Sequence, residues 1–144
     1  MENNNKNLVF VYGSLCSGLQ NNGILRNNNA KYLSIAKTVQ RYDMYDLGYF
    51  PGVIESDKGK FILGELYIVS DELLKRLDVL EGCPHFYQRK LVDVVFGDRE
   101  YPVAAYIYVL TKASLNPLDT KIPANDWRSY YHDKVDQIKA DVMR

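Results

Sequence analysis

The chain has 144 residues, of which 47% are hydrophobic and 25% are charged, which is the balance of one globular domain and not of a disordered chain. Lys and Arg together number 18, as do Asp and Glu, so the formal net charge is zero. A nucleic-acid binder usually carries a basic surface, and a membrane-attached protein often carries a polybasic patch. We therefore expect a single domain over residues 1–144 that binds neither nucleic acid nor a membrane.

The N-terminal region shows no sign of a targeting segment. Residues 1–7 are polar and rich in Asn, which predicts a flexible leader, and the apolar run at residues 8–12 is too short for the core of a signal peptide. No apolar stretch approaches the ~20 residues that a membrane-spanning helix needs. Cys16 and Cys83 are interpreted as reduced thiols, so we expect a cytoplasmic protein.

Short runs of β-branched and aromatic residues dominate the first half of the chain. They predict a buried strand at residues 8–12, one long or broken strand at 31–46 and a strand at 61–69. The segments between these strands are rich in Gly and Asn or contain Pro51. They predict a loop at 15–29, with one helical turn at 23–26, and a turn at 48–52.

The clearest helix follows the strand at residues 61–69. Ser70 occupies an N-cap position, and Asp71 and Glu72 lie in the first turn, where the helix dipole favours acids. Four leucines then share one face at helical spacing: Leu73, Leu74, Leu77 and Leu80. Gly82 as a C-cap residue, with Pro84 behind it, predicts the end of the helix.

The rest of the chain predicts two strands, at residues 88–96 and 103–110, joined by a turn at 97–100. Residues 125–143 predict a loop and a C-terminal helix that packs through Trp127, Tyr131, Val135 and Ile138. No internal repeat or linker divides the chain. Because strands outnumber helices, we expect an α+β fold: a mixed, strongly curved β-sheet or small β-barrel with peripheral helices.

The first candidate site is the turn Tyr12-Gly13-Ser14-Leu15, where a strand ends at a glycine. Such a turn can point consecutive backbone N–H groups into one concavity, which then binds a carboxylate or an oxyanion. Gly13 permits a positive φ or a close approach of the backbone to a ligand. Taken alone, the same residues also fit an ordinary strand-to-loop turn, which is the commoner structure.

The second candidate is Glu81, at the C-terminal end of the predicted helix and immediately before Gly82. The negative end of the helix dipole disfavours a carboxylate there, so the pKa of Glu81 should be raised, which suits proton transfer near neutral pH. A surface Glu with an ion-pair partner fits equally well. In the loop that follows, Tyr87 could orient a ligand or Glu81, whereas Arg89 fits best as a structural ion-pair partner.

Cysteine and histidine give weaker candidates. Cys83 and His85 are two positions apart, and Cys16 follows the glycine turn. A Cys–His hydrolase needs a third group that orients the histidine, and no pattern here identifies one. The two Cys and two His residues lack the paired spacing of a zinc site, so we expect no metal centre.

Five short motifs stand out along the chain. They are Phe10-Val11-Tyr12-Gly13-Ser14-Leu15, Gly48-Tyr49-Phe50-Pro51-Gly52, Gly64-Glu65-Leu66-Tyr67, Leu77-Asp78-Val79-Leu80-Glu81-Gly82 and Tyr87-Gln88-Arg89. Taken together, they resemble the γ-glutamylcyclotransferase superfamily, and specifically its γ-glutamylamine cyclotransferase-like branch. Each motif alone is weak, but all five occur in the order and spacing of the family. The match covers residue 8 to about residue 110, with a looser match in Asp126-Trp127-Arg128.

The resemblance implies a barrel-like mixed core and a cofactor-independent enzyme that acts on a small-molecule γ-glutamyl substrate. It implies that the backbone of Tyr12, Gly13, Ser14 and Leu15 binds the α-carboxylate end of the γ-glutamyl group. It also implies that Glu81 is the general acid and base, and that Tyr87 lies in the substrate site. The α-amine of the substrate would attack its own γ-carbonyl, which gives 5-oxoproline and a free amine.

Three alternatives stay open at this point. The first is a noncatalytic small-molecule binding module on the same fold, because fold does not fix function. The second is another transferase or a hydrolase that acts on γ-glutamyl or similar amides. The third is an interaction protein that docks through Trp127 and the C-terminal helix. The leaving group, the oligomeric state and the role of the Asn-rich segment 20–29 do not follow from the sequence.

Overall fold

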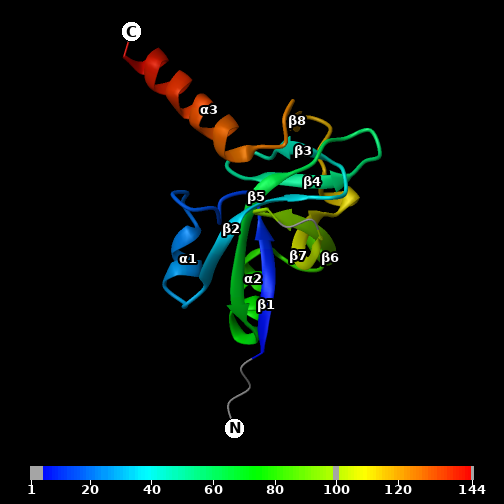
Figure 1. The fold of residues 1–144 in the computed structure, drawn as a ribbon. Helices are drawn as coiled ribbons and strands as arrows, with labels where there is room; N and C mark the ends of the chain where they lie inside the picture. Colours follow the sequence, from blue (N-terminus) through cyan, green and yellow to red (C-terminus); the bar gives the residue numbers. More distant parts are fainter. Residues whose placement is uncertain (1–4, 99–100, 144) are drawn as a thin grey trace.

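The computed structural model describes residues 5–98 and 101–143. Five of its strands form a closed barrel in the order β1-β5-β2-β6-β7 (Figure 1). Neighbours in the barrel are antiparallel, except that β1 and β7 pair in parallel where the barrel closes. The barrel strands are β1 (Lys6–Val11), β2 (Lys31–Thr38), β5 (Leu63–Ser70), β6 (Tyr87–Phe96) and β7 (Val103–Leu110). The expected α+β fold, with a small barrel of mixed strands, is confirmed.

The strand β1 is buried on both faces. Val9 and Val11 belong to one hydrophobic cluster, and Phe10 and Tyr12 belong to a second one, because successive side chains of a strand point to opposite sides. The strand begins at Lys6, two residues before its predicted start. Residues 1–4 of the predicted leader lie outside the described part of the chain.

A second sheet of three strands, β4-β3-β8, lies beside the barrel. Its strands are β3 (Tyr42–Asp46), β4 (Pro51–Glu55) and β8 (Thr120–Lys121). The predicted long strand at 31–46 is therefore broken, because β2 and β3 belong to different sheets. The predicted turn at 48–52 was too long: the Leu47 N–H bonds to the Phe50 carbonyl, and Pro51 already pairs with Asp46 as the first residue of β4. Proline is tolerated at that position because the first residue of a strand need not donate a ladder hydrogen bond.

The helix α2 (Asp71–Leu80) begins and ends as its sequence predicts. The Ser70 side chain accepts a hydrogen bond from the Leu73 N–H at 3.1 Å. At the other end Gly82 has φ of +66°, and the Cys83 N–H reaches back to the Asp78 carbonyl at 3.0 Å. This is a Schellman ending, which requires a left-handed residue and so favours glycine. Of the four leucines, Leu73, Leu74 and Leu77 are buried, whereas Leu80 is half exposed.

Two further helices, α1 (Asn22–Arg26) and α3 (Trp127–Val142), lie outside the barrel, and a 3-10 turn, η1 (Lys112–Ser114), follows β7. Trp127 at the start of α3 is fully buried, and Tyr131 packs against the same cluster. Beyond this first part the helix projects away from the body of the molecule (Figure 1). The prediction that Ile138 packs the helix was therefore wrong, since 54% of that residue is exposed.

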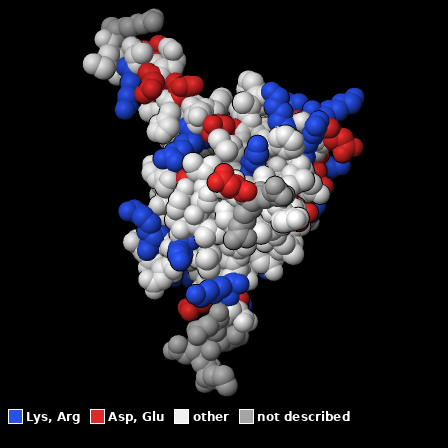
Figure 2. Space-filling model, in the orientation of Figure 1, with Lys and Arg blue, Asp and Glu red and all other residues white. Residues whose placement is uncertain are grey.

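Charged residues show no segregation on the face seen in Figure 2. Lys and Arg are interspersed with Asp and Glu on it, with no large patch of either sign. Within residues 5–98 and 101–143, no helix is long and apolar enough to cross a membrane. Residues 99 and 100, which belong to the predicted turn between β6 and β7, lie outside the described part of the chain.

Candidate active site

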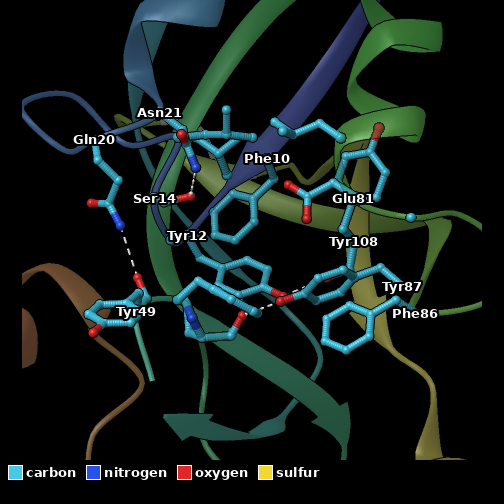
Figure 3. Close-up of a pocket in the computed structure, with 17 residues that line it drawn as sticks. Phe10, Tyr12, Ser14, Gln20, Asn21, Tyr49, Glu81, Phe86, Tyr87 and Tyr108 are labelled. Atoms are coloured by element: carbon cyan, nitrogen blue, oxygen red, sulfur yellow. Dashed lines mark hydrogen bonds between the residues drawn. The ribbon is translucent and has the colours of Figure 1, made fainter. Parts of the chain in front are cut away.

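A pocket of about 420 Å³ opens where the loop after β1, the loop before β4 and the end of α2 meet (Figure 3). Each of these segments adjoins a helix or a strand, so the rigid barrel and helix fix the pocket wall. All six residues singled out for a site from the sequence line this one pocket: Tyr12, Gly13, Ser14, Leu15, Glu81 and Tyr87. Residues that are up to 75 positions apart in the chain therefore meet in the fold.

The loop after β1 turns tightly around Gly13. The Cys16 N–H donates to the Gly13 carbonyl at 2.9 Å, which closes the turn. A Cβ atom on Gly13 would lie 2.7 Å from Cδ of Pro51, so the glycine is required by this close approach and not by a positive φ. Among the described residues, the backbone N–H groups of Gly13, Ser14 and Leu15 have no hydrogen-bond acceptor. They are available to an anionic group in the pocket.

Glu81 caps the C-terminal end of α2 and lines the pocket. Burial raises the pKa of its carboxyl from 4.5 to about 7. The sequence predicted this direction from the helix dipole, but burial is the cause that the structure identifies. Within the described residues, no side chain or backbone group pairs with the Glu81 carboxylate. The surface ion pair that the sequence left open is therefore not formed.

Arg89 takes the structural role that the sequence favoured. Its guanidinium binds the Asp78 carboxylate of α2 at 2.8 Å and lies over the Tyr106 ring, 4.6 Å from the ring centroid. The Tyr108 hydroxyl donates to the other oxygen of Asp78 at 2.7 Å. These contacts fasten the last turn of α2 to β6 and β7, and so hold the residue that follows it, Glu81, in place.

Two buried tyrosines form the wall of the pocket near Glu81. The Tyr12 hydroxyl donates to the Tyr108 carbonyl at 2.6 Å, and the Tyr87 hydroxyl donates to the Pro51 carbonyl at 2.5 Å. Burial raises the pKa of both phenols, and the nearby Glu81 carboxylate raises it further. Both tyrosines are therefore neutral near pH 7, and each hydroxyl donates its hydrogen bond to a backbone carbonyl. Among the residues that line the pocket, Glu81 is left with a pKa near neutral pH.

The pocket also contains residues that the sequence reasoning did not assign to a site. They are Phe10, Val11, Gln20, Asn21, Tyr49, Phe50, Pro51, Leu80, Gly82, Phe86 and Tyr108. Tyr49 and Phe50 belong to a motif that carried the family resemblance, so a signal for them was present. Gln20 and Asn21 lie in the Asn-rich segment, whose sequence has no recognisable pattern. Tyr108 lies within a strand, where nothing in the sequence separates it from a core residue.

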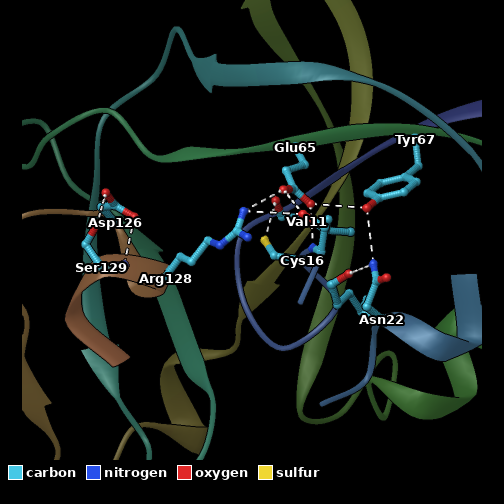
Figure 4. A network of polar contacts seen from close by, with 10 residues as sticks. Val11, Cys16, Asn22, Glu65, Tyr67, Asp126, Arg128 and Ser129 are labelled. Carbon is cyan, nitrogen blue, oxygen red and sulfur yellow. Dashed lines mark hydrogen bonds and ion pairs between the residues drawn. The ribbon is translucent and has the colours of Figure 1, made fainter. Parts of the chain in front are cut away.

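A buried carboxylate behind the loop holds it from the far side (Figure 4). Glu65 on β5 accepts hydrogen bonds from the backbone N–H of Ser17 at 2.8 Å and from its hydroxyl at 2.7 Å. The Tyr67 hydroxyl at 3.2 Å and the Arg128 guanidinium at 3.3 Å complete its partners. Because Arg128 belongs to α3, this cluster joins the loop, the barrel and the C-terminal helix.

The cysteines do not form a nucleophilic centre. Burial raises the pKa of Cys16, and Glu65 raises it further. Burial, followed by the charge of Asp78, raises the pKa of Cys83 to about 11. Both thiols are therefore protonated near pH 7, whereas a reactive cysteine needs a lowered pKa. Over residues 5–98 and 101–143, no group of three or more Cys, His, Asp or Glu side chains is arranged to hold a metal ion.

Comparisons with known proteins show the family of this chain. A family model described as gamma-glutamyl cyclotransferase, AIG2-like, matches residues 9–129. The chain belongs to this family. It is 30% identical to the human gamma-glutamylaminecyclotransferase in an alignment of length 138 that covers 83% of this chain and 87% of the relative. It is 35% identical to gamma-glutamylaminecyclotransferase B of Danio rerio in an alignment of length 114 that covers 73% of this chain and 60% of the relative.

A solved structure supports the same assignment. The crystal structure of an AIG2-like protein from Mus musculus superposes with a TM-score of 0.73 at 25% identity, over 84% of this chain and 88% of the mouse chain. The family resemblance found in the sequence is therefore confirmed. All six site residues lie in the motifs that carried the resemblance. The first motif contains Tyr12-Gly13-Ser14-Leu15, the fourth contains Glu81 and the fifth begins with Tyr87.

The Glu65 cluster predicts a stability effect. Replacing Glu65 by Gln puts an N–H₂ group where the Ser17 backbone N–H or hydroxyl now finds an acceptor, so one buried donor loses its partner. We expect the free energy of unfolding to fall by about 1–3 kcal/mol in urea denaturation. Glu55→Gln is the matched control, because its ion pair with Lys90 is long, at 3.4 Å, and exposed. Equal stability of the two variants would contradict the role of the cluster.

The raised pKa of Glu81 predicts a pH-dependent stability. Between pH 4.5 and about pH 7, the folded chain holds a proton on Glu81 that the unfolded chain releases. This group therefore lowers the free energy of unfolding as the pH rises through that range. Glu81→Gln removes the effect, so the variant should gain stability over the wild type above pH 7 and show no such gain below pH 4.5. A stability difference that is independent of pH, measured by urea denaturation, would contradict this account.

Proposed function

We propose that the protein cleaves γ-glutamyl amides by an intramolecular cyclisation that releases 5-oxoproline and a free amine. The observation that carries the proposal is a half-buried carboxylate, that of Glu81, which has no partner among the described residues. It shares one pocket with the N–H groups of Gly13, Ser14 and Leu15, which have no acceptor among the described residues either. In Figure 3, Ser14 and Glu81 lie on opposite sides of the pocket. A γ-glutamyl group has a matching arrangement, with a carboxylate at one end and the reacting amide at the other.

The loop suits the α-carboxylate of the substrate. Its three backbone N–H groups have no acceptor among the described residues, and backbone N–H groups bind carboxylates without a cation. The loop is braced by Pro51 on one side and by Glu65 on the other. A braced loop loses little conformational freedom when the substrate binds, so it can fix the orientation of the glutamyl chain.

The cyclisation forms one C–N bond and breaks another. The α-amine nitrogen attacks the γ-carbonyl carbon, and the bond from that carbon to the leaving nitrogen then breaks. Glu81 accepts the proton that the α-amine loses and donates it to the leaving nitrogen, so no proton is gained or lost overall. A carboxyl group with a pKa of about 7 can accept and donate with similar ease near neutral pH. The nucleophile is already tethered to the carbonyl, so the reaction requires no cofactor.

Two features of the family and of the site support this function. The relatives named above are gamma-glutamylaminecyclotransferases, and this chain matches one of them over 83% of its length. The pocket holds the acid–base group that cyclisation requires. The alternative, a noncatalytic binding module on the same fold, needs the pocket but does not need a carboxylate with a raised pKa. A cytoplasmic location and a small-molecule substrate are part of the proposal.

A product assay with a conservative variant tests the proposal. Purified protein is incubated with a panel of γ-glutamyl amines and γ-glutamyl dipeptides, and 5-oxoproline is measured by mass spectrometry. We expect Glu81→Gln to lower the rate about 10²-fold or more, because general acid–base groups contribute that much. Glu72→Gln, an exposed acid in the first turn of the same helix, is the control and should keep the wild-type rate.

The products separate the competing functions. Glutamate without 5-oxoproline would show a hydrolase. Ligand binding in a thermal-shift assay without either product would show a binding module. Wild-type turnover by Glu81→Gln would remove Glu81 from the mechanism.

A further inference from the structure

Asp46 ends β3 and fastens the turn at residues 47–50, which joins β3 to β4. Its Oδ1 accepts a hydrogen bond from the Gly48 N–H at 2.8 Å, across the turn. Its Oδ2 accepts hydrogen bonds from the Tyr130 hydroxyl at 2.8 Å and from Lys134 Nζ at 2.9 Å. Both of these donors belong to α3, and they are 84 and 88 positions away along the chain. The C-terminal helix therefore holds this turn.

The carboxylate of Asp46 is enclosed and charged. Its side chain is 8% exposed. Burial alone would raise the pKa of this carboxyl, but the hydrogen bonds from Lys134, Gly48 and Tyr130 outweigh burial and lower the pKa. Lys134 Nζ also donates to the Gly48 carbonyl at 3.2 Å. One ammonium group thus binds both the enclosed carboxylate and the backbone of the turn, and its removal would leave the carboxylate without its cation.

The turn at 47–50 forms part of the pocket wall. Tyr49 and Phe50 line the pocket, and the Tyr49 carbonyl accepts a hydrogen bond from Gln20 Nε2 at 2.9 Å (Figure 3). Gln20 belongs to the loop after β1, so the two loops meet each other at the pocket. A contact that fixes the turn therefore also fixes one side of the wall.

The first turn of α3 holds the loop after β1 as well. The Arg128 guanidinium lies 3.3 Å from the Ser17 hydroxyl and 3.3 Å from the Glu65 carboxylate. Trp127 anchors this end of the helix, because it is fully buried and its ring lies beside the Tyr130 ring, with the centroids 5.5 Å apart. Both loops of the pocket are thus attached to the same helix.

The contacts of α3 are confined to its first half. Every residue from 136 to 142 is exposed, and this part of the helix projects away from the body (Figure 1). The family model matches residues 9–129, so Tyr130 and Lys134 lie beyond the segment that carries the family assignment. Their contacts with Asp46 are a feature of this chain's own C-terminal helix.

We propose that Lys134 is a positioning residue of the pocket, which acts through Asp46 to fix the turn at 47–50 and so strengthens substrate binding without touching the substrate. Glu81 is held by a separate set of contacts, through Asp78 on α2. Loss of the Lys134 contact should therefore weaken substrate binding and leave proton transfer intact. The inference rests on the proposed function, because its main readout is the formation of 5-oxoproline.

Steady-state kinetics with three variants test the inference. Lys134→Met removes the ammonium group and keeps the length of the side chain, so we expect KM to rise about threefold or more while kcat stays within about twofold. Lys134→Arg keeps a cation and should restore most of the wild-type KM. Lys139→Met makes the same change at an exposed position of the same helix and should leave both constants unchanged.

A double-mutant cycle tests whether Lys134 acts through Asp46. Asp46→Asn removes the charge that Lys134 binds, so it should raise KM by itself. Adding Lys134→Met to Asp46→Asn should then raise KM little further, because the two residues act as one unit. Independent effects, in which the two increases multiply, would overturn the inference.

Hydrogen exchange gives a readout that does not need activity. In Lys134→Met, the amides of residues 47–50 should exchange faster than in the wild type, and those of α2 should not, as measured by mass spectrometry. Faster exchange with an unchanged KM would show a structural contact only and would overturn the inference, as would a lowered kcat with an unchanged KM. No 5-oxoproline from the wild type would overturn the proposed function, and with it the role of Lys134 in substrate binding.

Discussion

The site depends on a half-buried carboxylate, that of Glu81, for which the described residues supply no cation and no hydrogen-bond donor. A carboxylate in that position is less stable when ionised, and its pKa rises until proton uptake and release balance near neutral pH. The fold achieves this with the Schellman ending of α2, which places Glu81 at the pocket, and with Asp78, which ties the same turn to Arg89 and Tyr108. These contacts hold Glu81 in place without an ion pair to its own carboxylate. A direct ion pair would lower the pKa of that carboxyl.

The two loops of the pocket depend on each other. Pro51 fits so closely against Gly13 that a side chain on the glycine would collide with it, and the carbonyl of the same proline holds the Tyr87 hydroxyl. The loop after β1, the start of β4 and the start of β6 therefore meet at Pro51. Glu65 on β5 adds a second brace and links the loop to Arg128 on α3. A displacement in any of these segments would alter the pocket wall.

Much of the fold was predictable, because the sequence patterns that specify helices and strands are local. The capped helix α2 and the barrel strands follow from spacing and β-forming residues. The split of residues 31–46 between two sheets depends on distant partners, because β2 pairs with β5 and β6. The strand at Pro51 forms because it pairs with β3 across a short hairpin, which overrides the local preference of Pro and Gly for turns. Ile138 has helical spacing, but the sequence does not show that α3 leaves the barrel before reaching it.

The site was predictable only in part, for a similar reason. Its six assigned residues lie in local motifs, and the structure brings them to one pocket. Glu65 was not recognised as the brace of the loop, because its partners Ser17 and Arg128 are 48 and 63 positions away. The pKa of Glu81 had the predicted direction but a different cause, since the burial of a helix end depends on what packs around it. That the Tyr12 and Tyr87 hydroxyls donate hydrogen bonds to backbone carbonyls also required the structure.

The most direct test of the account is to follow the side-chain carboxyl carbon of Glu81 by ¹³C NMR as the pH is changed. A midpoint of about 7 would agree with a buried carboxylate that is ready to exchange a proton, and a midpoint near the ordinary 4.5 would contradict it.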